Sequence, residues 1–487
     1  MDNTSKSIIS GTIYTALGKY SSIVIQLIVT AILARFIAPE DFGVMAVCSV
    51  FINLFYLLGD LGVGPAIIQR KDITKCDLNE YFTFSFYFGL TLAVIFLLLA
   101  PVISHFYDNE LLIKVLSILS LQIFFATFNM VPGALLMKNK EFKFVAIRTI
   151  VIQFSLGVIS CIAAIRGAGI YALLINPIIG SSSIFLLNYF HLERLHFTKK
   201  VHRSSLNKIF NYSVFQFLFC LQNYIYRNID KLIIGKYLTM EQLGYYEKSY
   251  RLMLMPVQNI SSVVTPVLQP VLSNYQDNVN TQKLYFTKIT KLLAVIGFPI
   301  SVFLFFCARE IILIVFGNQW VEAIMPFKIL ALSVAPQMLG SVLGSIYLST
   351  NNVKPQLYIG LINTVWSVSM ILFGLLYFRT TVGVATMFTI ALLVELIYNW
   401  TYVYSRIYKV KLYHFYLLLA RPILIALLLG ASLYIEDMLV GDINILLSLL
   451  LKIFISIILV VASLHLLKVY DVKLLFNTIT KKWGRNF

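Results

Sequence analysis

Several ionisable side chains stand inside otherwise apolar segments of the sequence, and most of them carry positive charge. The cations predicted to line a cavity are Lys19, Arg227, Lys231, Lys248 and Arg251. Arginine suits phosphate because its guanidinium presents a fixed fork of donors, and lysine binds the same group as a point charge. A charge at membrane depth costs at least ~2.5–3.5 kcal/mol on insertion scales, so such residues are functional by default. The residue types therefore indicate a site for an anion, with no catalytic residue among them.

Polar residues accompany these cations at helical spacing. One set is Thr12, Thr15, Lys19, Ser22, Gln26 and Thr30, and another is Ser213, Gln216, Cys220, Asn223, Arg227 and Asp230. Steps of three and four residues place each set on one helix face, and we expect both faces to look toward protein or water. The residues predicted to be cavity-polar or charge-balancing are Gln26, Asp60, Asn223 and Asp230. Packing between membrane helices through interhelical hydrogen bonds is the alternative explanation for such faces.

The composition places these residues in a membrane protein. Of the 487 residues, 59% are hydrophobic and only 13% are charged, whereas soluble domains are about half apolar and a quarter charged. Apolar runs of about 20 residues, the length a helix needs to cross ~30 Å of hydrocarbon, recur along nearly the whole chain. The sequence therefore predicts an all-α polytopic membrane protein.

About fourteen transmembrane helices are predicted, joined by short connections. Their ranges are 9–33, 42–64, 81–103, 112–136, 145–165, 169–190, 209–233, 243–270, 286–307, 323–348, 356–377, 382–404, 414–435 and 444–467. The even-numbered connections and both tails are rich in Lys and Arg, and the odd-numbered connections are poorer in cations. This asymmetry places both termini in the cytoplasm. Much of the formal charge of +17 is explained in this way, so no nucleic-acid partner is expected.

A short polar hinge sequence occurs twice in the chain. LARFIAPEDFGVM at 33–45 aligns with IGKYLTMEQLGYY at 234–246, and the aligned glycines Gly43 and Gly244 are 201 residues apart. Because six spans separate the copies, both cross the membrane in the same direction, as in transporters built from parallel repeats. The predicted fold is therefore two pseudo-symmetric six-helix lobes plus two extra helices. The predicted parts are an N-lobe at 1–190, a basic cytoplasmic linker at 191–208, a C-lobe at 209–404, and helices 13–14 with a basic cytoplasmic tail at 405–487.

Four stretches also carry a family resemblance: SGTIYTALGKYSSIVIQ, LARFIAPEDFGVMAV, GDLGVGPAIIQR and RNIDKLIIGKYLTMEQLGYYEKSYRL. The chain resembles the multidrug/oligosaccharidyl-lipid/polysaccharide (MOP) exporter superfamily, and most of all its polysaccharide transporter branch of Wzx-type flippases and colanic-acid-exporter-like proteins. The resemblance implies two lobes that export a polyprenyl-pyrophosphate-linked oligosaccharide by alternating access across the bacterial cytoplasmic (inner) membrane. Such an oligosaccharide would be a precursor of lipopolysaccharide, capsule or exopolysaccharide.

The resemblance also implies roles for particular residues. Family flippases use cations on helices 1, 2, 7 and 8 to meet the lipid pyrophosphate, and matching positions here are Lys19 on the first span, Arg227 and Lys231 on the seventh, and Lys248 and Arg251 on the eighth. The second span departs from this pattern, because it offers Asp60 and no cation. The implied partners are the lipid-linked glycan, the lipid bilayer and proteins of glycan assembly.

Two other functions compete with export of a glycan. A MATE-like ion-coupled antiporter of small molecules shares the fold, but a transporter of cations is expected to hold acidic residues in its cavity, and the first span carries Lys19 instead. An enzyme would need a sizeable outer loop for catalytic residues, and the chain contains no HExxH, GxSxG or GxxxxGK[ST] motif. The five cysteines are scattered, so neither a metal site nor a cofactor is predicted, and the sequence names no coupling ion.

Overall fold

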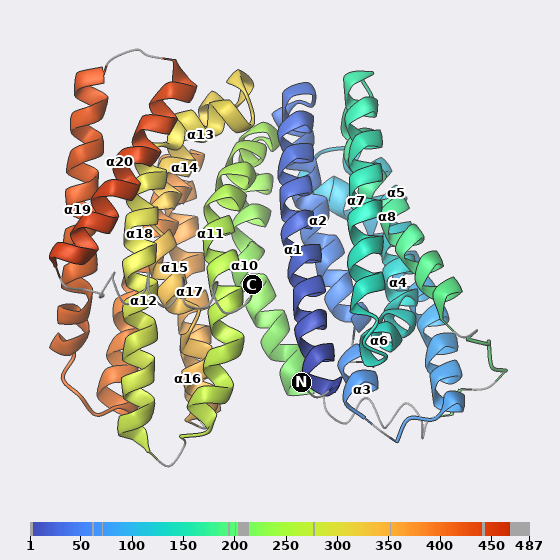
Figure 1. Ribbon diagram of the computed structural model, residues 1–487. Coiled ribbons are helices and arrows are strands. Elements are labelled where there is room, and N and C mark those ends of the chain that lie inside the picture. The colour runs from blue at the N-terminus through green and yellow to red at the C-terminus, as the bar shows by residue number, and fades with distance from the viewer. Residues whose placement is uncertain are drawn as a thin grey trace. The chain divides into compact units, whose positions relative to one another are not determined.

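The computed structural model describes residues 3–60, 63–70, 72–192, 195–199, 201–202, 214–275, 278–350, 352–440 and 444–467, and this part of the chain is helical (Figure 1). It divides into two compact units, Met1–Gly244 and Tyr245–Phe487. The boundary lies at the start of one helix, and the units are described separately below. The finer division at 190, 208 and 404 stays a prediction.

The first unit contains nine complete helices within its described residues. They are α1 (Asn3–Phe36), α2 (Pro39–Asp60), α3 (Val63–Gln69), α4 (Lys75–Tyr107), α5 (Leu111–Phe128), α6 (Met130–Lys138), α7 (Phe142–Ile165), α8 (Ile170–His191) and α10 (Val214–Tyr237). The next helix, α11 (Met240–Ser273), begins in this unit and continues into the second.

The second unit continues from α11 with helices of very different length. They are α12 (Val279–Phe306), α13 (Ala308–Val315), the 3₁₀ turn η1 (Asn318–Ala323), α14 (Ile324–Ala331), α15 (Val334–Gly340), α16 (Leu343–Ser349), α17 (Val353–Phe378), α18 (Thr381–Tyr402), the π-helical turn η2 (Val403–Ile407), α19 (Tyr413–Val440) and α20 (Ile445–Leu466).

Eleven helices of the described chain are long and apolar enough to cross a membrane, which makes this a multi-pass membrane protein. A bent pair, Asn318–Ala331 with Val334–Ser349 at 48°, raises the number to twelve if it forms one span. The helices α10 and α11 are outside this set, because each is an amphipathic helix whose polar face lowers its mean hydropathy. The described helices overlap all fourteen predicted ranges, but fourteen spans remain a prediction.

An aromatic cluster forms the core where α4, α5 and α8 meet in the first unit. The Phe128 ring stacks on Phe185 at 4.2 Å and on Phe82 at 4.7 Å between centroids. Stacked aromatic pairs of this kind add about 0.5–1.5 kcal/mol beyond the area they bury. The cluster packs α4, α5 and α8 against one another and forms the core of this part of the unit.

The described part of the predicted linker docks on α4. The backbone amides of His196 and Thr198 donate to the side chains of Asn79 and Thr83, at 3.0 and 2.9 Å. The backbone amide of His202 donates to Glu80, which is 3% exposed, at 2.9 Å. A linker expected to be a solvated basic loop is therefore held against the end of a membrane helix over these residues.

The second unit has its own aromatic core. The Trp400 ring stacks between Phe286 and Phe415, with centroid distances of 5.1 and 4.6 Å, and so joins α18 to α12 and α19. The helix α19, which overlaps the predicted thirteenth span, packs against α12 in this unit.

Candidate functional site

The repeated hinge returns as a pair of helix breaks. The helices α1 and α2 are separated at 37–38, and α10 and α11 at 238–239, so both breaks keep the 201-residue offset. The aligned glycines are buried. A Cβ added at Gly43 would overlap the carbonyl oxygen of Met240, and one added at Gly244 would overlap that of Pro39. Pro39 and Met240 are themselves an aligned pair, so the contact is reciprocal, as across a two-fold axis.

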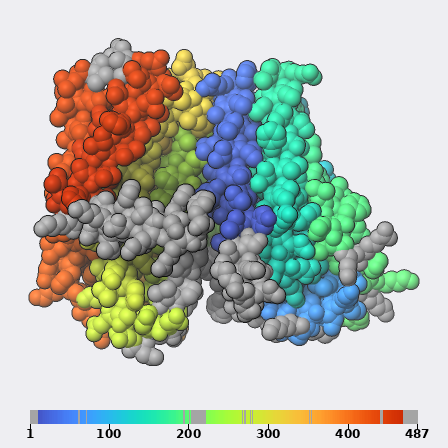
Figure 2. All heavy atoms as spheres, in the orientation of Figure 1, coloured from blue at the N-terminus to red at the C-terminus, as the bar shows by residue number. Residues whose placement is uncertain are grey.

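Helix α1 packs on α7 through a seam of small residues and is exposed over much of the rest of its surface. Gly18 lies against Ala146, where an added Cβ would be 3.1 Å from the alanine methyl carbon. Lys19 and Gln26 are exposed. Figure 2 shows α1 beside α7 with its outward side uncovered. The small residue on the seam allows the two helices to approach closely.

Arg227 and Asn223 form the exposed part of the polar face on α10. Both side chains are exposed, and the Arg227 Nε donates to the Asn223 Oδ1 at 3.4 Å, across one helical turn. The Lys231 ammonium is partly buried and donates to the Asn228 Oδ1 at 3.4 Å. Of these cations, Arg227 presents its donors most openly to an approaching anion.

Hydrogen bonds anchor α10 to α2 and α4. The Tyr224 hydroxyl donates to the Val50 carbonyl of α2, and the Tyr107 hydroxyl of α4 donates to the Leu232 carbonyl at 3.3 Å. At the hinge end of α10, the Lys236 ammonium bonds the Asp108 carboxylate at 3.0 Å. This hydrogen bond to Lys236 holds the pKa of Asp108 below its ordinary value. These bonds hold α10 within the first unit, and the Arg227 side chain stays exposed.

The cations on α11 differ sharply in exposure. Lys248 is 4% exposed, whereas Arg251 is exposed. Beside Lys248, the Ser249 hydroxyl donates to the Ala323 carbonyl at 2.8 Å, which packs this face of α11 against η1. Lys248 is therefore buried in the second unit, and its role as a cavity cation stays a prediction.

The two acidic residues of the predicted site have different outcomes. Asp230 is 1% exposed on α10. Asp60 is the last residue of α2, and its side chain lies outside the described part of the structure, as does Ser213. Asp230 is therefore buried within the first unit, and the position of the Asp60 side chain stays undetermined.

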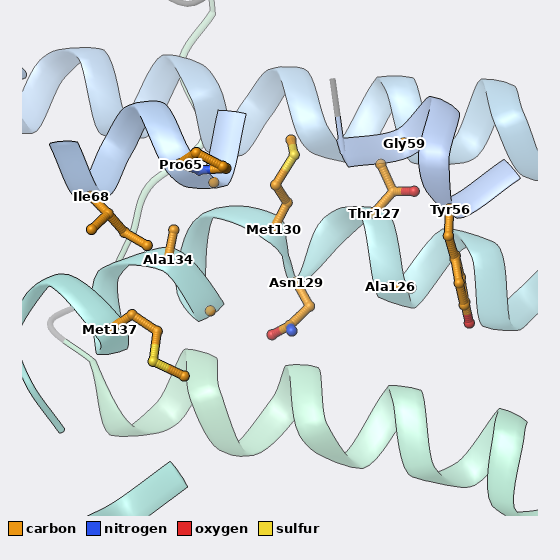
Figure 3. A pocket seen from close by; sticks show the side chains of 12 residues that line it. Tyr56, Gly59, Pro65, Ile68, Ala126, Thr127, Asn129, Met130, Ala134 and Met137 are labelled. Carbon is orange, nitrogen blue, oxygen red and sulfur yellow. The ribbon is translucent and has the colours of Figure 1, made fainter. Parts of the chain in front are cut away.

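A pocket of about 370 Å³ lies where α2 and α3 face the junction of α5 and α6 (Figure 3). Its polar lining comes from Tyr56, Thr127 and Asn129, and its apolar lining includes Met130 and Met137. The helix break at Asn129 opens this space, because α5 ends at Phe128 and α6 begins at Met130. The sequence analysis missed the pocket, because its lining combines residues 56–68 with residues 126–137, which are distant in sequence.

Asn129 also begins a polar relay into the lobe. Its Oδ1 accepts a hydrogen bond from the Asn188 Nδ2 at 2.7 Å, and Asn188 in turn accepts one from the Arg148 guanidinium. Asn188 is 1% exposed, so it depends on these two partners. The relay fixes the amide that faces the pocket.

The arrangement suits binding rather than bond-breaking chemistry. Exposed cations on α1 and α10 can attract an anion, and neighbouring amides such as Gln26 and Asn223 can bind hydroxyl groups. Among the described residues, no group of three or more His, Cys, Asp and Glu side chains is placed to hold a metal ion.

Solved transporters share this fold. The structure of the lipid II flippase MurJ in an inward closed conformation superposes with a TM-score of 0.77 at 17% identity, covering 93% of this chain and 98% of that one. An inward-facing multidrug resistance MATE transporter of the MOP superfamily superposes with a TM-score of 0.61 at 16% identity, covering 79% of this chain and 94% of that one. These likenesses show the fold: the chain is a helical membrane protein folded like MurJ and the MATE transporters.

The sequence comparisons identify the family within that class. A family model described as polysaccharide biosynthesis protein matches residues 32–325, more than half of the chain, and the chain belongs to this family. It is 26% identical over 444 residues to the teichuronic acid biosynthesis protein TuaB of Bacillus subtilis, covering 88% of this chain and 89% of TuaB. It is 24% identical over 346 residues to the lipopolysaccharide biosynthesis protein WzxC of Escherichia coli, covering 70% of each.

Proposed function

We propose that this protein is a flippase that moves a polyprenyl-pyrophosphate-linked oligosaccharide across the bacterial cytoplasmic membrane by alternating access. The proposal rests on the exposure of cations on α1 and α10 in a chain of the polysaccharide biosynthesis family. The relatives are named for teichuronic acid and lipopolysaccharide biosynthesis, and the structural neighbour MurJ for flipping lipid II. The proposed activity is transport, with no chemical step on the glycan.

The proposed topology has fourteen spans and both termini in the cytoplasm. Eleven apolar helices, the bent pair, α10 and α11 together support this number. The distribution of Lys and Arg between alternate connections supports the orientation. In this topology the hinges at 37–38 and 238–239 lie on the outer side of the membrane.

The proposed substrate contact begins at Arg227 and Lys19. Their exposure allows the guanidinium and the ammonium to meet the pyrophosphate, and Gln26 and Asn223 lie one or two turns away to bind sugar hydroxyls. Arg251 is exposed on α11 and is assigned the same kind of role. Lys231 and Lys248 are assigned to a later stage of transport, because each must become more exposed before it can reach a phosphate.

The alternative of a MATE-like antiporter rests on the fold alone. MATE transporters are neighbours at 15–16% identity, and that level of similarity does not carry a substrate from one protein to another. The relatives that match in sequence are named for polysaccharides. A glycan substrate also suggests that proteins of glycan assembly act beside this transporter.

Complementation of a strain that lacks its own flippase tests the proposal. Removing a charged hydrogen bond costs about 1.5–3 kcal/mol, which corresponds to a roughly 10- to 100-fold loss of transport. We therefore expect Arg227→Ala to abolish complementation, Lys19→Ala to weaken it strongly, and Arg227→Lys to restore only part of it, because lysine lacks the bidentate fork. Glycan export is measured at the cell surface, and membrane levels are measured by immunoblot.

Arg166→Ala is the matched control, since Arg166 is an exposed arginine at the end of α7 and outside the polar faces. It should complement fully. Normal export by both Arg227→Ala and Lys19→Ala would reject the assigned contacts. Full complementation of the flippase-deficient strain by an empty vector, or its absence with the wild-type chain, would reject the transport assignment itself.

A further inference from the structure

A buried group of charges joins α13, α19 and α20 in the second unit. This carboxylate–lysine cluster consists of Glu310, Glu436, Asp437 and Lys452. Lys452 lies seven residues into α20, about 10 Å along the helix, and is 2% exposed. Glu310 and Glu436 are each 6% exposed, whereas the side chain of Asp437 is 43% exposed.

All three N–H donors of the Lys452 ammonium are used by other acceptors, so Lys452 makes no hydrogen bond to Glu436. It bonds the Glu310 Oε1 at 2.6 Å, the Asp437 Oδ1 at 2.6 Å and the Phe306 carbonyl oxygen at 3.3 Å. An ammonium has three N–H donors, so none remains. The nearest Glu436 oxygen is 3.9 Å from the Lys452 Nζ, which is beyond hydrogen-bond distance.

The two buried carboxyl groups therefore have unlike surroundings. Glu310 accepts from Lys452 and also from the Ser448 hydroxyl at 3.0 Å, as an ionised carboxylate does. Neither oxygen of Glu436 has a hydrogen-bond donor among the described residues, and both oxygens are inaccessible to solvent. A buried carboxylate without a donor is costly, and such a group becomes neutral by binding a proton instead.

The charged side chains around the cluster do not supply a hydrogen-bond donor for Glu436. The elements α12 and α13 pack against α19 and α20, and their nearby titratable groups are Cys307 and Arg309. Tyr434 is on α19 itself, and Glu322 and Lys328 are on η1 and α14, which pack against α13. Arg309 and Glu322 are exposed, and the Lys328 ammonium lies over the Phe305 ring at 4.6 Å. The cations Lys291 and Arg421 are on α12 and α19 but lie fifteen residues from the cluster, about 22 Å along their helices.

We propose that Glu436 is a proton-binding site, occupied by one proton at neutral pH, at the junction of α13, α19 and α20. A metal cation does not fit as well, because the Lys452 ammonium already occupies the centre of the cluster at 2.6 Å from two carboxylates. Any movement of α20 that turned a Lys452 donor toward Glu436 would release this proton. Binding of the proton and the position of α20 are therefore linked, and each must affect the other.

Infrared spectroscopy of the full chain in lipid nanodiscs tests the proposal, because a protonated carboxyl group has a carbonyl band that a carboxylate lacks. At pH 7 we expect the wild-type spectrum to contain such a band that Glu436→Gln loses. Glu395→Gln should keep it, since Glu395 is a buried carboxylate elsewhere in the second unit, on α18, and accepts a hydrogen bond from the Ser367 hydroxyl at 2.6 Å. The band should be the same in sodium chloride and in choline chloride.

The stability of the variants gives a second readout. Glutamine has the shape and charge of a protonated glutamate, so Glu436→Gln should melt within about 2 °C of the wild type at pH 7 in the same nanodiscs, on the scale where 1 kcal/mol shifts Tm by 2–4 °C. Glu310→Gln should melt lower, because it removes the ionised partner of a buried lysine. An unchanged band in Glu436→Gln, a band abolished by sodium, or a Glu436→Gln chain that unfolds would each overturn the proposal.

Discussion

The two copies of the hinge share their backbone geometry but differ in the helices that lead into them. Both copies break the helix at aligned positions, and both bring a glycine against the backbone of the other copy. The helix before the first hinge, α1, is an apolar span with one cation at depth, whereas α10 is amphipathic and carries Arg227, Asp230 and Lys231. The close backbone contact requires a glycine in both copies of the hinge. The charged side chains are not repeated in the same way, because most of them are on α10.

The largest expected effect comes from filling the contact between the hinges. Gly43→Ala and Gly244→Ala should each lower the free energy of unfolding by about 1–3 kcal/mol or more, because the new Cβ would overlap a backbone oxygen that cannot rotate away. Thermal unfolding in nanodiscs measures the loss. Gly340→Ala is the control, since nothing lies within 4 Å of its added Cβ. Unequal losses at the two hinges would contradict the reciprocal contact.

The cation Arg227 is on the helix that leads into the second hinge, and the aligned position on α1 tests whether it must be there. The 201-residue offset aligns Gln26 with Arg227, and both are exposed. We expect Arg227→Gln to reduce glycan export roughly 10- to 100-fold, as the loss of a charged hydrogen bond implies. Adding Gln26→Arg should recover part of the export, because the aligned position offers the same fork of donors. No recovery at normal membrane levels would show that the two polar faces are not equivalent.

A smaller effect is expected at an anchor that only α10 possesses. Tyr224 donates to the Val50 carbonyl, and the aligned position on α1 is Ile23, which has no donor. Tyr224→Phe should cost about 0.5–1.5 kcal/mol of stability, the net contribution of one hydrogen bond. Thermal unfolding measures this cost, and Ile23→Leu should change Tm by less than Tyr224→Phe does.

The smallest effect concerns the ion pair between Asp108 and Lys236. The pKa of Asp108 is lowered in the folded protein, so its ion pair stabilises the fold above the ordinary pKa of about 3.9. That stability is lost as the pH falls through the lowered pKa. The Tm difference between the wild type and Asp108→Asn should be small at pH 7 and should disappear in strong acid. A difference that grows in acid would contradict the sign.

Much of the fold follows from local pattern. The apolar runs and the hinge motif predict helices over all fourteen ranges, and the described helices overlap each of them, with breaks at 37–38 and 238–239. Segment 112–136 was predicted as one span, and Leu111–Lys138 is one candidate span by length and composition. Within it, α5 and α6 meet at Asn129, whose side chain accepts a hydrogen bond from Asn188, which in turn accepts one from Arg148. Helical periodicity predicts which residues share a polar face. It does not predict a helix boundary whose hydrogen-bond partners are distant in sequence.

The candidate site shows the same limit. Lys19, Gln26, Asn223 and Arg227 are exposed, and their role in binding stays a prediction. Lys248 is buried, and Ser249 beside it bonds to Ala323 of η1, more than 70 residues further along the chain. Spacing determines which residues share a face, and long-range packing determines whether that face is covered.

The sequence by itself determined the membrane class, the family, the repeated hinge and the residues that share each polar face, because these depend on composition and on periods of a few residues. Only the tertiary structure decided that Gly43 and Gly244 touch across the repeat, and that α10 is anchored through Tyr224 and Lys236. It also decided that Lys452 leaves Glu436 without a donor. Each of these depends on which distant atoms come within about 4 Å, and no local pattern in the chain encodes that.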